Sequence, residues 1–371
     1  MMKTLKSDRK MNLKHKILLI SISLTTLFLY TGCSRKETGM TNEPAATINE
    51  SQVLYDYLKQ KGDYINSEAA PAIMTAPELY ALLDRNIHLI DLREADQFNQ
   101  GHIEGAVNVS PEHVIDYFEN RIDAPYFERV VFLCSRGQLS AYVNGIMRIL
   151  GCTNTYSVRY GMSGWNTQFA KTGWDKATGT FPDNLTMESS DQPVAKAGMP
   201  EIATGGINGF QIARLRAKAL LDTAQASFLI NYSDIEKSPE KYDVVAYVPA
   251  DWFGNNVHPA GTMNFVPKAS LKEEASLRLL SPGKPVAVYC FNGHHSAHAV
   301  AWLRMMGYEA YSVIYGANGF MYDRFDNDDK TTPRQWTDRQ KNDFPFKSGT
   351  AGGGDKDEKK VVVKQTQGGC A

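Results

Sequence analysis

The sequence has almost no net charge, few cysteines, and no apolar run long enough for a confident membrane span. Its 40 Lys and Arg residues offset 41 Asp and Glu residues, which leaves a net charge of −1. Because nucleic-acid binding usually leaves a strongly basic footprint, composition gives no general argument for a nucleic-acid partner. Five cysteines in 371 residues are too few for a disulfide-held scaffold. A chain of this length can instead form two or three domains, each with its own apolar core.

The N-terminal region has the pattern of an export signal. Basic residues precede an apolar segment at residues 17–30, which is short and interrupted by Ser and Thr. The next residues, Thr31-Gly-Cys33, resemble a bacterial lipoprotein box, with Tyr30 where Leu is usual. The resemblance implies a signal peptide at residues 1–33, a lipid on Cys33, and anchoring in the cell envelope at the periplasmic face of a bacterial membrane, with the outer membrane as one option. The alternatives are an ordinary cleaved signal and an uncleaved anchor.

Two cysteines occupy the same position in two similar stretches of sequence. Cys134 and Cys290 each end an apolar, strand-like run, and each has Gly three residues later and Ser six residues later. The preceding Gly105 and Gly261 stand at one separation, 29 residues (134 − 105 and 290 − 261). Downstream, Tyr160-Gly161 has a counterpart in Tyr315-Gly316. Agreement at one offset indicates two copies of one unit.

Strand-like apolar runs alternate with helical spacing in both copies. This alternation predicts an α/β fold with two domains, each a mainly parallel sheet flanked by helices on both faces. In the second copy the expected helix at 212–221 is followed by an expected strand at 228–232. The predicted divisions are a tether at 34–72, a first domain at 73–175, a linker at 176–205, a second, divergent domain at 206–325 and a flexible C-terminal tail at 326–371.

The predicted position of the two cysteines favours nucleophilic chemistry. Open α/β sheets bind ligands at the carboxyl ends of their strands, where both residues are expected. A loop that leads into a helix offers unpaired backbone N–H groups and a positive dipole end, which favour a thiolate and a neighbouring anion. A single cysteine of this kind is equally often a buried core residue, but its recurrence favours function. Cys152 is interpreted as a small packed residue, and Cys370 as an incidental exposed thiol or a mobile sulfur carrier.

Four short motifs of the first copy stand in an order that resembles the rhodanese family of sulfurtransferases, in its tandem two-domain form. They are Ile90-Asp-Leu-Arg93, Gly101-His-Ile-Glu-Gly-Ala-Val-Asn108, Cys134-Ser-Arg-Gly-Gln-Leu-Ser140 and Gly161-Met-Ser-Gly-Trp165. The second copy matches more loosely, and Asn231 and Tyr232 stand in the region where the first copy has Asp91 and Arg93. The resemblance implies two rhodanese-like domains of the thiosulfate or 3-mercaptopyruvate sulfurtransferase type.

This resemblance also implies a mechanism without a cofactor or a metal. A cysteine thiolate takes a sulfane sulfur from an anionic donor such as thiosulfate, holds it as a persulfide, and passes it to a thiol or another thiophilic acceptor. Cys134 and Cys290 are the candidate nucleophiles; Arg136 favours Cys134, although two-domain relatives commonly use the C-terminal cysteine. Asp91 and Arg93 are expected to form a supporting ion pair. The expected substrate-binding residues are Ser135, Arg136, Gly137, Gln138, Leu139 and Ser140 in the first loop, and Phe291, Asn292, Gly293, His294, His295 and Ser296 in the second.

Three other functions fit parts of the pattern. A cysteine phosphatase or arsenate reductase requires Arg six residues after the cysteine, where this chain has Ser140 and Ser296. His294 and His298 have the spacing of two metal ligands on one helix face, but the first copy has no histidines there. The third alternative is a non-catalytic carrier of sulfur or selenium that works with an envelope redox partner.

Overall fold

The computed structural model describes residues 48–177, 185–188, 198–224, 227–272, 276–324 and 335–350. The predicted signal peptide, Cys33 and Cys370 lie outside these residues. In the described part of the chain, no helix has both the length and the apolar character needed to cross a bilayer.

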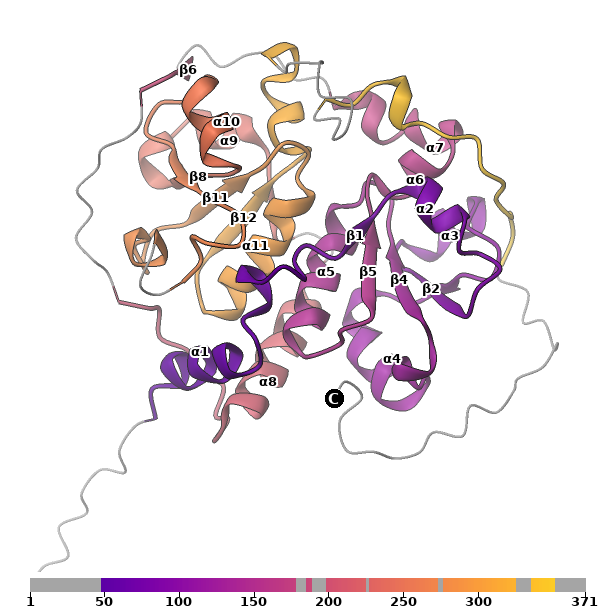
Figure 1. Ribbon diagram of the computed structural model, residues 1–371, viewed down its shortest axis with the longest axis horizontal. Coiled ribbons are helices and arrows are strands. Elements are labelled where there is room, and N and C mark those ends of the chain that lie inside the picture. The colour runs from indigo at the N-terminus through magenta and orange to yellow at the C-terminus, as the bar shows by residue number, and fades with distance from the viewer. Residues whose placement is uncertain are drawn as a thin grey trace, which may run out of the picture. The chain divides into compact units, whose positions relative to one another are not determined.

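The first unit is built on a parallel sheet of five strands in the order β1-β5-β4-β2-β3 (Figure 1). The strands are β1 (Ile73–Met74), β2 (Ile87–Asp91), β3 (Val107–Asn108), β4 (Arg129–Leu133) and β5 (Thr155–Val158). The helices are α2 (Ala76–Tyr80), α3 (Ala95–Gln100), α4 (Val114–Asn120), α5 (Gln138–Ile149), α6 (Gly161–Trp165) and α7 (Thr167–Ala170).

The second unit repeats this topology. Its sheet has the order β7-β12-β11-β8-β10 when read from the edge strand β7, which corresponds strand by strand to the first sheet. The strands are β7 (Leu229–Ile230), β8 (Asp243–Tyr247), β10 (Met263–Phe265), β11 (Val286–Tyr289) and β12 (Ala310–Val313), and the helices are α8 (Gly209–Leu221), α9 (Tyr232–Glu236), α10 (Ala250–Asn255) and α11 (His294–Met305). A small antiparallel pair joins β6 (Leu185–Thr186) to β9 (His258–Pro259).

Alternate side chains of each sheet pack into different apolar clusters, as expected for strands covered on both faces. In β4, Val130 and Phe132 join one cluster, whereas Val131 and Leu133 join another on the opposite face. The first of these clusters, which we call the shared core, also contains residues of the second sheet and of the helices α5, α8 and α11. The predicted fold class is therefore confirmed: parallel sheets with helices on both faces, in two units joined by one core.

The equivalence of the two sheets corrects one sequence assignment. Asp91 pairs with Asn108 in the first sheet as Ala246 pairs with Asn264 in the second. The counterpart of Asp91 is therefore Ala246 on β8, and Arg93 corresponds to Val248. Asn231 and Tyr232 were assigned to these positions because the apolar run before them looks like the central strand of the first copy. That run forms β7, the edge strand that corresponds to β1.

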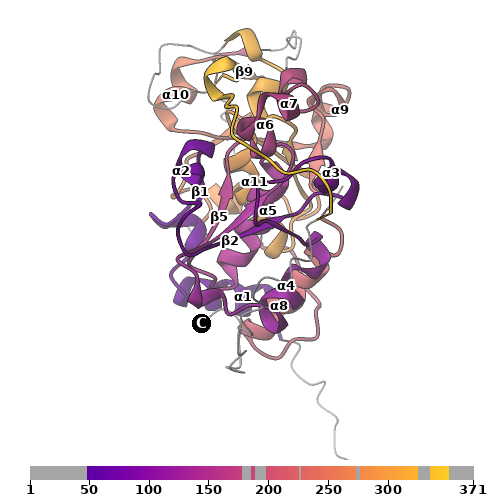
Figure 2. The ribbon, with the colours of Figure 1, turned by 90° about the vertical axis from the view of Figure 1, so that its right-hand side faces the viewer.

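The predicted tether is wrong for residues 48–72. Helix α1 (Glu50–Gln60) buries Leu54 and Leu58 in the shared core, and Ile65 is buried in the turn that follows. α1 lies beside α8 in both views (Figure 2), and its Glu50 carboxylate accepts the Thr204 N–H at 2.7 Å. Residues 34–72 are polar on average, which led to the prediction of a tether. Helix α1 within this range is amphipathic, and tertiary contacts cover its apolar side.

The predicted flexible tail is also wrong for residues 335–350. Trp336 is buried, and the Phe344 ring stacks on Tyr80 with ring centroids 4.2 Å apart. Trp165 of α6 donates its indole N–H to the Pro345 carbonyl at 2.8 Å, and Lys347 pairs with His102. This segment, yellow in Figure 2, runs along the first unit past α6 towards α3. Phe344 packs against the first unit's outer apolar cluster, and Trp336 joins a separate cluster with Tyr160 and Trp174.

Candidate active site

Cys134 lies between the end of a central strand, β4, and the start of a long helix, α5. It directly follows β4, is 3% exposed, and is separated from α5 by a three-residue loop. Gly137 in this loop has a φ of 90°, in the left-handed region that favours glycine. A Cβ there would also lie 2.3 Å from the Nε2 atom of His294 and 2.8 Å from the backbone nitrogen of Tyr160. Only glycine lets the loop turn and approach the second unit so closely.

The Cys134 sulfur lies in a cradle of hydrogen-bond donors. The backbone N–H of Gly137 donates to Sγ at 3.1 Å, and that of Ser140 donates at 3.3 Å. The Ser140 hydroxyl lies 3.4 Å from Sγ and donates to the Gly137 carbonyl at 3.1 Å. Backbone donors at the amino end of a 12-residue helix stabilise negative charge on sulfur. The arrangement therefore suits a thiolate and also a persulfide anion.

Cys290 has a similar but weaker setting in the second unit. It follows β11, is 2% exposed, and precedes α11 through a loop in which Gly293 has a φ of 81°. The Ser296 N–H donates to its Sγ at 3.3 Å, and the Asn292 Oδ1 atom lies 4.0 Å away. Among the described contacts, the Cys290 sulfur accepts one backbone N–H and the Cys134 sulfur accepts two. The first loop is thus the better anion cradle.

The two cysteine loops are interlocked by the residues four positions after each cysteine. Gln138 reaches into the second unit, where its Nε2 donates to the Val313 carbonyl at 3.0 Å and its Oε1 accepts the Tyr315 N–H at 2.8 Å. His294 reaches into the first unit, where its Nε2 accepts the Tyr160 N–H at 3.1 Å. Each side chain therefore fills the same position in the opposite unit.

A tyrosine from the opposite unit completes each loop. Arg136 donates to the Tyr315 hydroxyl at 3.2 Å and lies over its ring, 5.4 Å from the centroid. In the second loop, Asn292 donates to the Tyr160 hydroxyl at 3.4 Å, and burial raises the pKa of Tyr160. Arg136 is exposed and cationic, whereas the second loop has the neutral Asn292. The first loop can therefore attract an anion that the second would not.

The remaining predicted loop residues take structural positions. The Ser135 carbonyl accepts hydrogen bonds from Ser163, and Leu139 packs against the shared core. Phe291 meets the Trp252 ring edge-on, and His295 is half-buried. The sequence pattern showed the repeated Tyr160 and Tyr315 but gave no signal that each serves the other unit's loop, because contacts between units leave no local periodicity.

A buried ion pair supports the strand beside Cys134. The Arg93 Nε atom donates to the Asp91 Oδ1 atom at 2.9 Å, and Arg93 Nη2 donates to the Gly101 carbonyl at 2.7 Å. Asp91 is fully buried, and Arg93 is 5% exposed. In the sheet Asp91 pairs with Leu133, the residue before Cys134. His102 stacks on Phe98 and forms a hydrogen bond with the Phe98 carbonyl, as expected of a hydrogen-bonded turn residue.

The structure also bears on the interpretations of Cys152 and of the histidine pair. Cys152 is buried and packs in the shared core, as expected of a small packed residue, and it is also disulfide-bonded, whereas Cys134 and Cys290 are free. His294 accepts the Tyr160 N–H and His298 bonds the Tyr64 hydroxyl, and the described residues contain no group of three metal-ligating side chains.

Acidification is expected to destabilise the protein through its buried histidines, among them His294 at the interlock and His298 one turn further along α11. Burial lowers the pKa of His294 to about 3 and that of His298 well below its ordinary 6.5. At a pH between the folded-state pKa and 6.5, these histidines are protonated in the unfolded chain but neutral in the folded one. The free energy of unfolding therefore decreases as the pH falls below 6.5. Each histidine can contribute up to about 1.4 kcal/mol per pH unit, or roughly 2 kcal/mol between pH 6.5 and 5. Urea unfolding at a series of pH values measures this slope.

The control for this prediction is an exposed histidine. His113→Gln should leave the pH slope unchanged, because its side chain is largely exposed, whereas His294→Gln should flatten the slope. Equal slopes in the wild type and His294→Gln would show that His294 is not held neutral by burial.

Comparison with known proteins finds a family whose sequences are similar to the stretch around Cys134. Residues 75–168 match the family model described as a Rhodanese-like domain. The thiosulfate sulfurtransferase GlpE of Shewanella oneidensis is 28% identical over 83 residues, which are 22% of this chain and 78% of that protein.

Solved structures with partial likeness include two proteins of this kind. A rhodanese-related protein of Thermoplasma volcanium is 24% identical, over 27% of this chain and 95% of its own, with a TM-score of 0.24. A thiosulfate sulfurtransferase of Pseudomonas aeruginosa is 17% identical, over 76% of this chain and 48% of its own, with a TM-score of 0.26. The sequence match shows that residues 75–168, which include Cys134 and its loop, are similar to a rhodanese-like domain.

Proposed function

We propose that the protein is a rhodanese-type sulfurtransferase that moves a sulfane sulfur from an anionic donor such as thiosulfate to a thiophilic acceptor. The observation that carries this proposal is the pair of backbone N–H groups, from Gly137 and Ser140, that point at the Cys134 sulfur. The family match of residues 75–168 supports sulfurtransferase-type function. By the same strand order, we assign the second unit to this domain type as well.

The proposed reaction has two displacement steps at sulfur. The Cys134 thiolate attacks the outer sulfur of thiosulfate, a new S–S bond forms, and the original S–S bond breaks with its electron pair leaving on sulfite. The persulfide that remains carries a negative terminal sulfur, which the backbone donors stabilise. An acceptor such as cyanide or a thiolate then attacks this terminal sulfur and releases the Cys134 thiolate. Arg136, exposed at the mouth of the loop, orients the anionic donor.

The test is persulfide loading followed by intact-mass measurement. After treatment with thiosulfate and removal of excess donor, the wild type should gain the mass of one sulfur atom, and peptide mapping should place it on Cys134. Cys134→Ala should gain none there, whereas Cys290→Ala should load as the wild type does. A protein that no sulfane donor loads at either cysteine would refute the proposal.

A second candidate is a non-catalytic sulfur or selenium carrier that acts with an envelope redox partner. Both thiols are almost completely buried, at 3% and 2% exposure, which favours delivery by a docked partner over free turnover. The carrier would load once without turning over thiosulfate and cyanide, whereas the enzyme would produce thiocyanate continuously.

The proposed location is the bacterial cell envelope, with the mature chain attached by lipid at Cys33. The Thr31-Gly-Cys33 pattern supports this proposal. The same intact-mass measurement, on protein extracted from membranes, should give a chain that begins at an acylated Cys33. A chain that retains residues 1–32, or that begins elsewhere without lipid, would refute it.

A further inference from the structure

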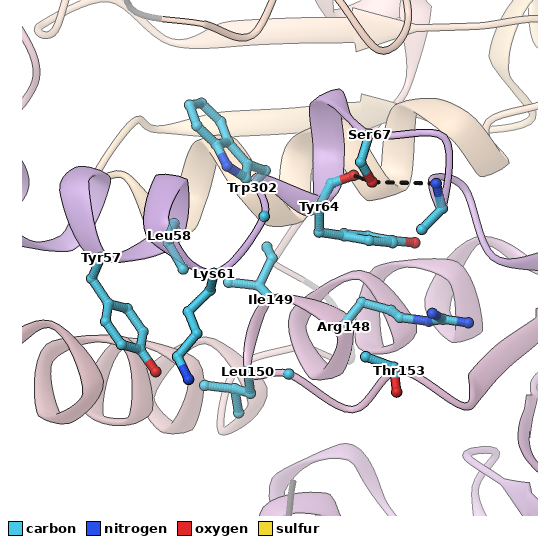
Figure 3. Close-up of a pocket in the computed structure, with 13 residues that line it drawn as sticks. Tyr57, Leu58, Lys61, Tyr64, Ser67, Arg148, Ile149, Leu150, Thr153 and Trp302 are labelled. Carbon is cyan, nitrogen blue, oxygen red and sulfur yellow. Dashed lines mark hydrogen bonds between the residues drawn. The ribbon is translucent and has the colours of Figure 1, made fainter. Parts of the chain in front are cut away.

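A cavity of about 270 Å³ lies at the end of α5 opposite to Cys134. The helix has 12 residues, so the cavity is separated from the cysteine loop by about 18 Å along the helix axis. Its walls come from residues 57–69, from the carboxyl end of α5 and from Trp302 of α11. Figure 3 shows Tyr57 and Lys61 on one side of this space and Tyr64 and Arg148 on the other. Neither cysteine loop contributes, so the cavity is separate from the candidate active site.

The cavity is positively charged without compensation. Arg148 and Lys61 line it, and its described lining contains no Asp or Glu. Arg148 is 9% exposed; its Nε donates to the Thr155 carbonyl at 2.7 Å, and its guanidinium lies 5.8 Å from the Tyr64 ring centroid. Within the described residues, neither Arg148 nor Lys61 forms an ion pair with a carboxylate. A buried cation is usually paired with an anion, because removing it from water is costly. Arg148 is therefore suited to pair with an acidic group of a ligand.

The remaining walls fit a flat apolar body. Tyr57, Tyr64 and Trp302 present three aromatic side chains, and the exposed lining of the cavity is mainly apolar. Cavities for drug-sized ligands measure roughly 300–1,000 Å³, so this one is suited to a ligand of about one ring. The planar guanidinium of Arg148 can hold a carboxylate with two parallel N–H donors.

We propose that this cavity binds a small planar organic anion, a single ring that carries a carboxylate. Arg148 takes the carboxylate, Lys61 adds attraction at the rim, and the aromatic side chains contact the ring. The site is independent of the proposed sulfur transfer, and its test does not require the protein to be active.

Ligand-observed NMR titration of the full chain with benzoate tests the proposal, with benzamide as the neutral analogue of the same shape. Benzoate should bind in the millimolar range or tighter, and benzamide at least tenfold more weakly, because it lacks the charge that Arg148 recognises. Arg148→Lys keeps the charge but loses the planar fork, and should weaken benzoate binding about tenfold. Equal binding of benzoate and benzamide, or no benzoate binding at millimolar concentration, would overturn the proposal.

A matched pair of lysine variants keeps the test decisive if Arg148→Lys fails to fold. Lys59 lies in the last turn of α1 and Lys61 directly follows this helix. Each lies 5.9 Å from a tyrosine ring, but only Lys61 lines the cavity. Lys61→Met should weaken benzoate binding several-fold, whereas Lys59→Met should leave it unchanged. Equal losses in the two variants would mean that only general surface charge attracts the anion, and would count against the site.

The last variant tests whether the disulfide at Cys152 affects benzoate binding in the cavity. Cys152 is disulfide-bonded and stands between Gly151 and Thr153, which both line the cavity. The titration is therefore repeated with Cys152→Ser. Benzoate binding by both proteins supports the proposal. Binding by Cys152→Ser alone would show that the disulfide keeps ligands out of the cavity, and would overturn the proposal.

Discussion

Replacing Cys134 by serine is expected to abolish sulfur transfer, lowering the rate of cyanide-dependent thiocyanate formation by on the order of 10³-fold or more. A serine hydroxyl remains protonated in this loop and cannot hold a sulfane sulfur as a persulfide. The backbone N–H groups of Gly137 and Ser140 would remain in place, so the loss would come from the nucleophile alone. Steady-state thiocyanate production with thiosulfate and cyanide measures the effect.

The matched control is the equivalent change in the second loop. Cys290→Ser is expected to keep most of the activity, because its sulfur accepts one described backbone N–H and no cation comparable to Arg136 lies in its loop. Unfolding curves for both variants show whether the fold is intact. If Cys134→Ser stayed active while Cys290→Ser lost activity, the assignment of the two cysteines would be reversed.

The sequence was sufficient to predict the features that depend on local pattern. Apolar runs such as Val130–Leu133 are long enough to identify central strands, and a cysteine directly after such a run can be placed at a carboxyl end. Gly137 and Gly293 could be placed in loops because they recur between a strand and a helix at one offset. Their left-handed φ values are the physical reason for glycine at both positions.

Contacts between distant segments could not be predicted in the same way. The bonds of Gln138 to Tyr315 and of His294 to Tyr160 join residues more than 130 positions apart, and no periodicity links them. Segments at the two ends were misjudged for the same reason, since Leu54 and Trp336 are buried by partners that only the folded chain brings near. The expected strand at 228–232 is present as β7, but Asn231 is not equivalent to Asp91, because β7 is the edge strand that corresponds to β1 and not to β2.

Replacing Arg93 by leucine is expected to lower the free energy of unfolding by about 3–5 kcal/mol. The change leaves the fully buried Asp91 carboxylate without its ion-pair partner and frees the Gly101 carbonyl, to which Arg93 donates. Urea unfolding, followed by circular dichroism, measures the loss. Arg85→Leu is the control, because Arg85 pairs with Glu128 in the same two-pronged way but with both side chains about half exposed; it should cost under about 1 kcal/mol.

The second unit indicates how the loss from Arg93→Leu should be restored. At the positions of Asp91 and Arg93 it has Ala246 and Val248, both buried, on a strand with the same register. Its Asn264 still donates to the carbonyls of those two residues, as Asn108 does in the first unit. This strand position therefore tolerates an apolar pair, and Asp91→Ala combined with Arg93→Val should recover most of the lost stability. A double variant no more stable than Arg93→Leu would mean instead that the ion pair itself, and not the avoidance of a lone buried charge, holds β2 beside the cysteine strand.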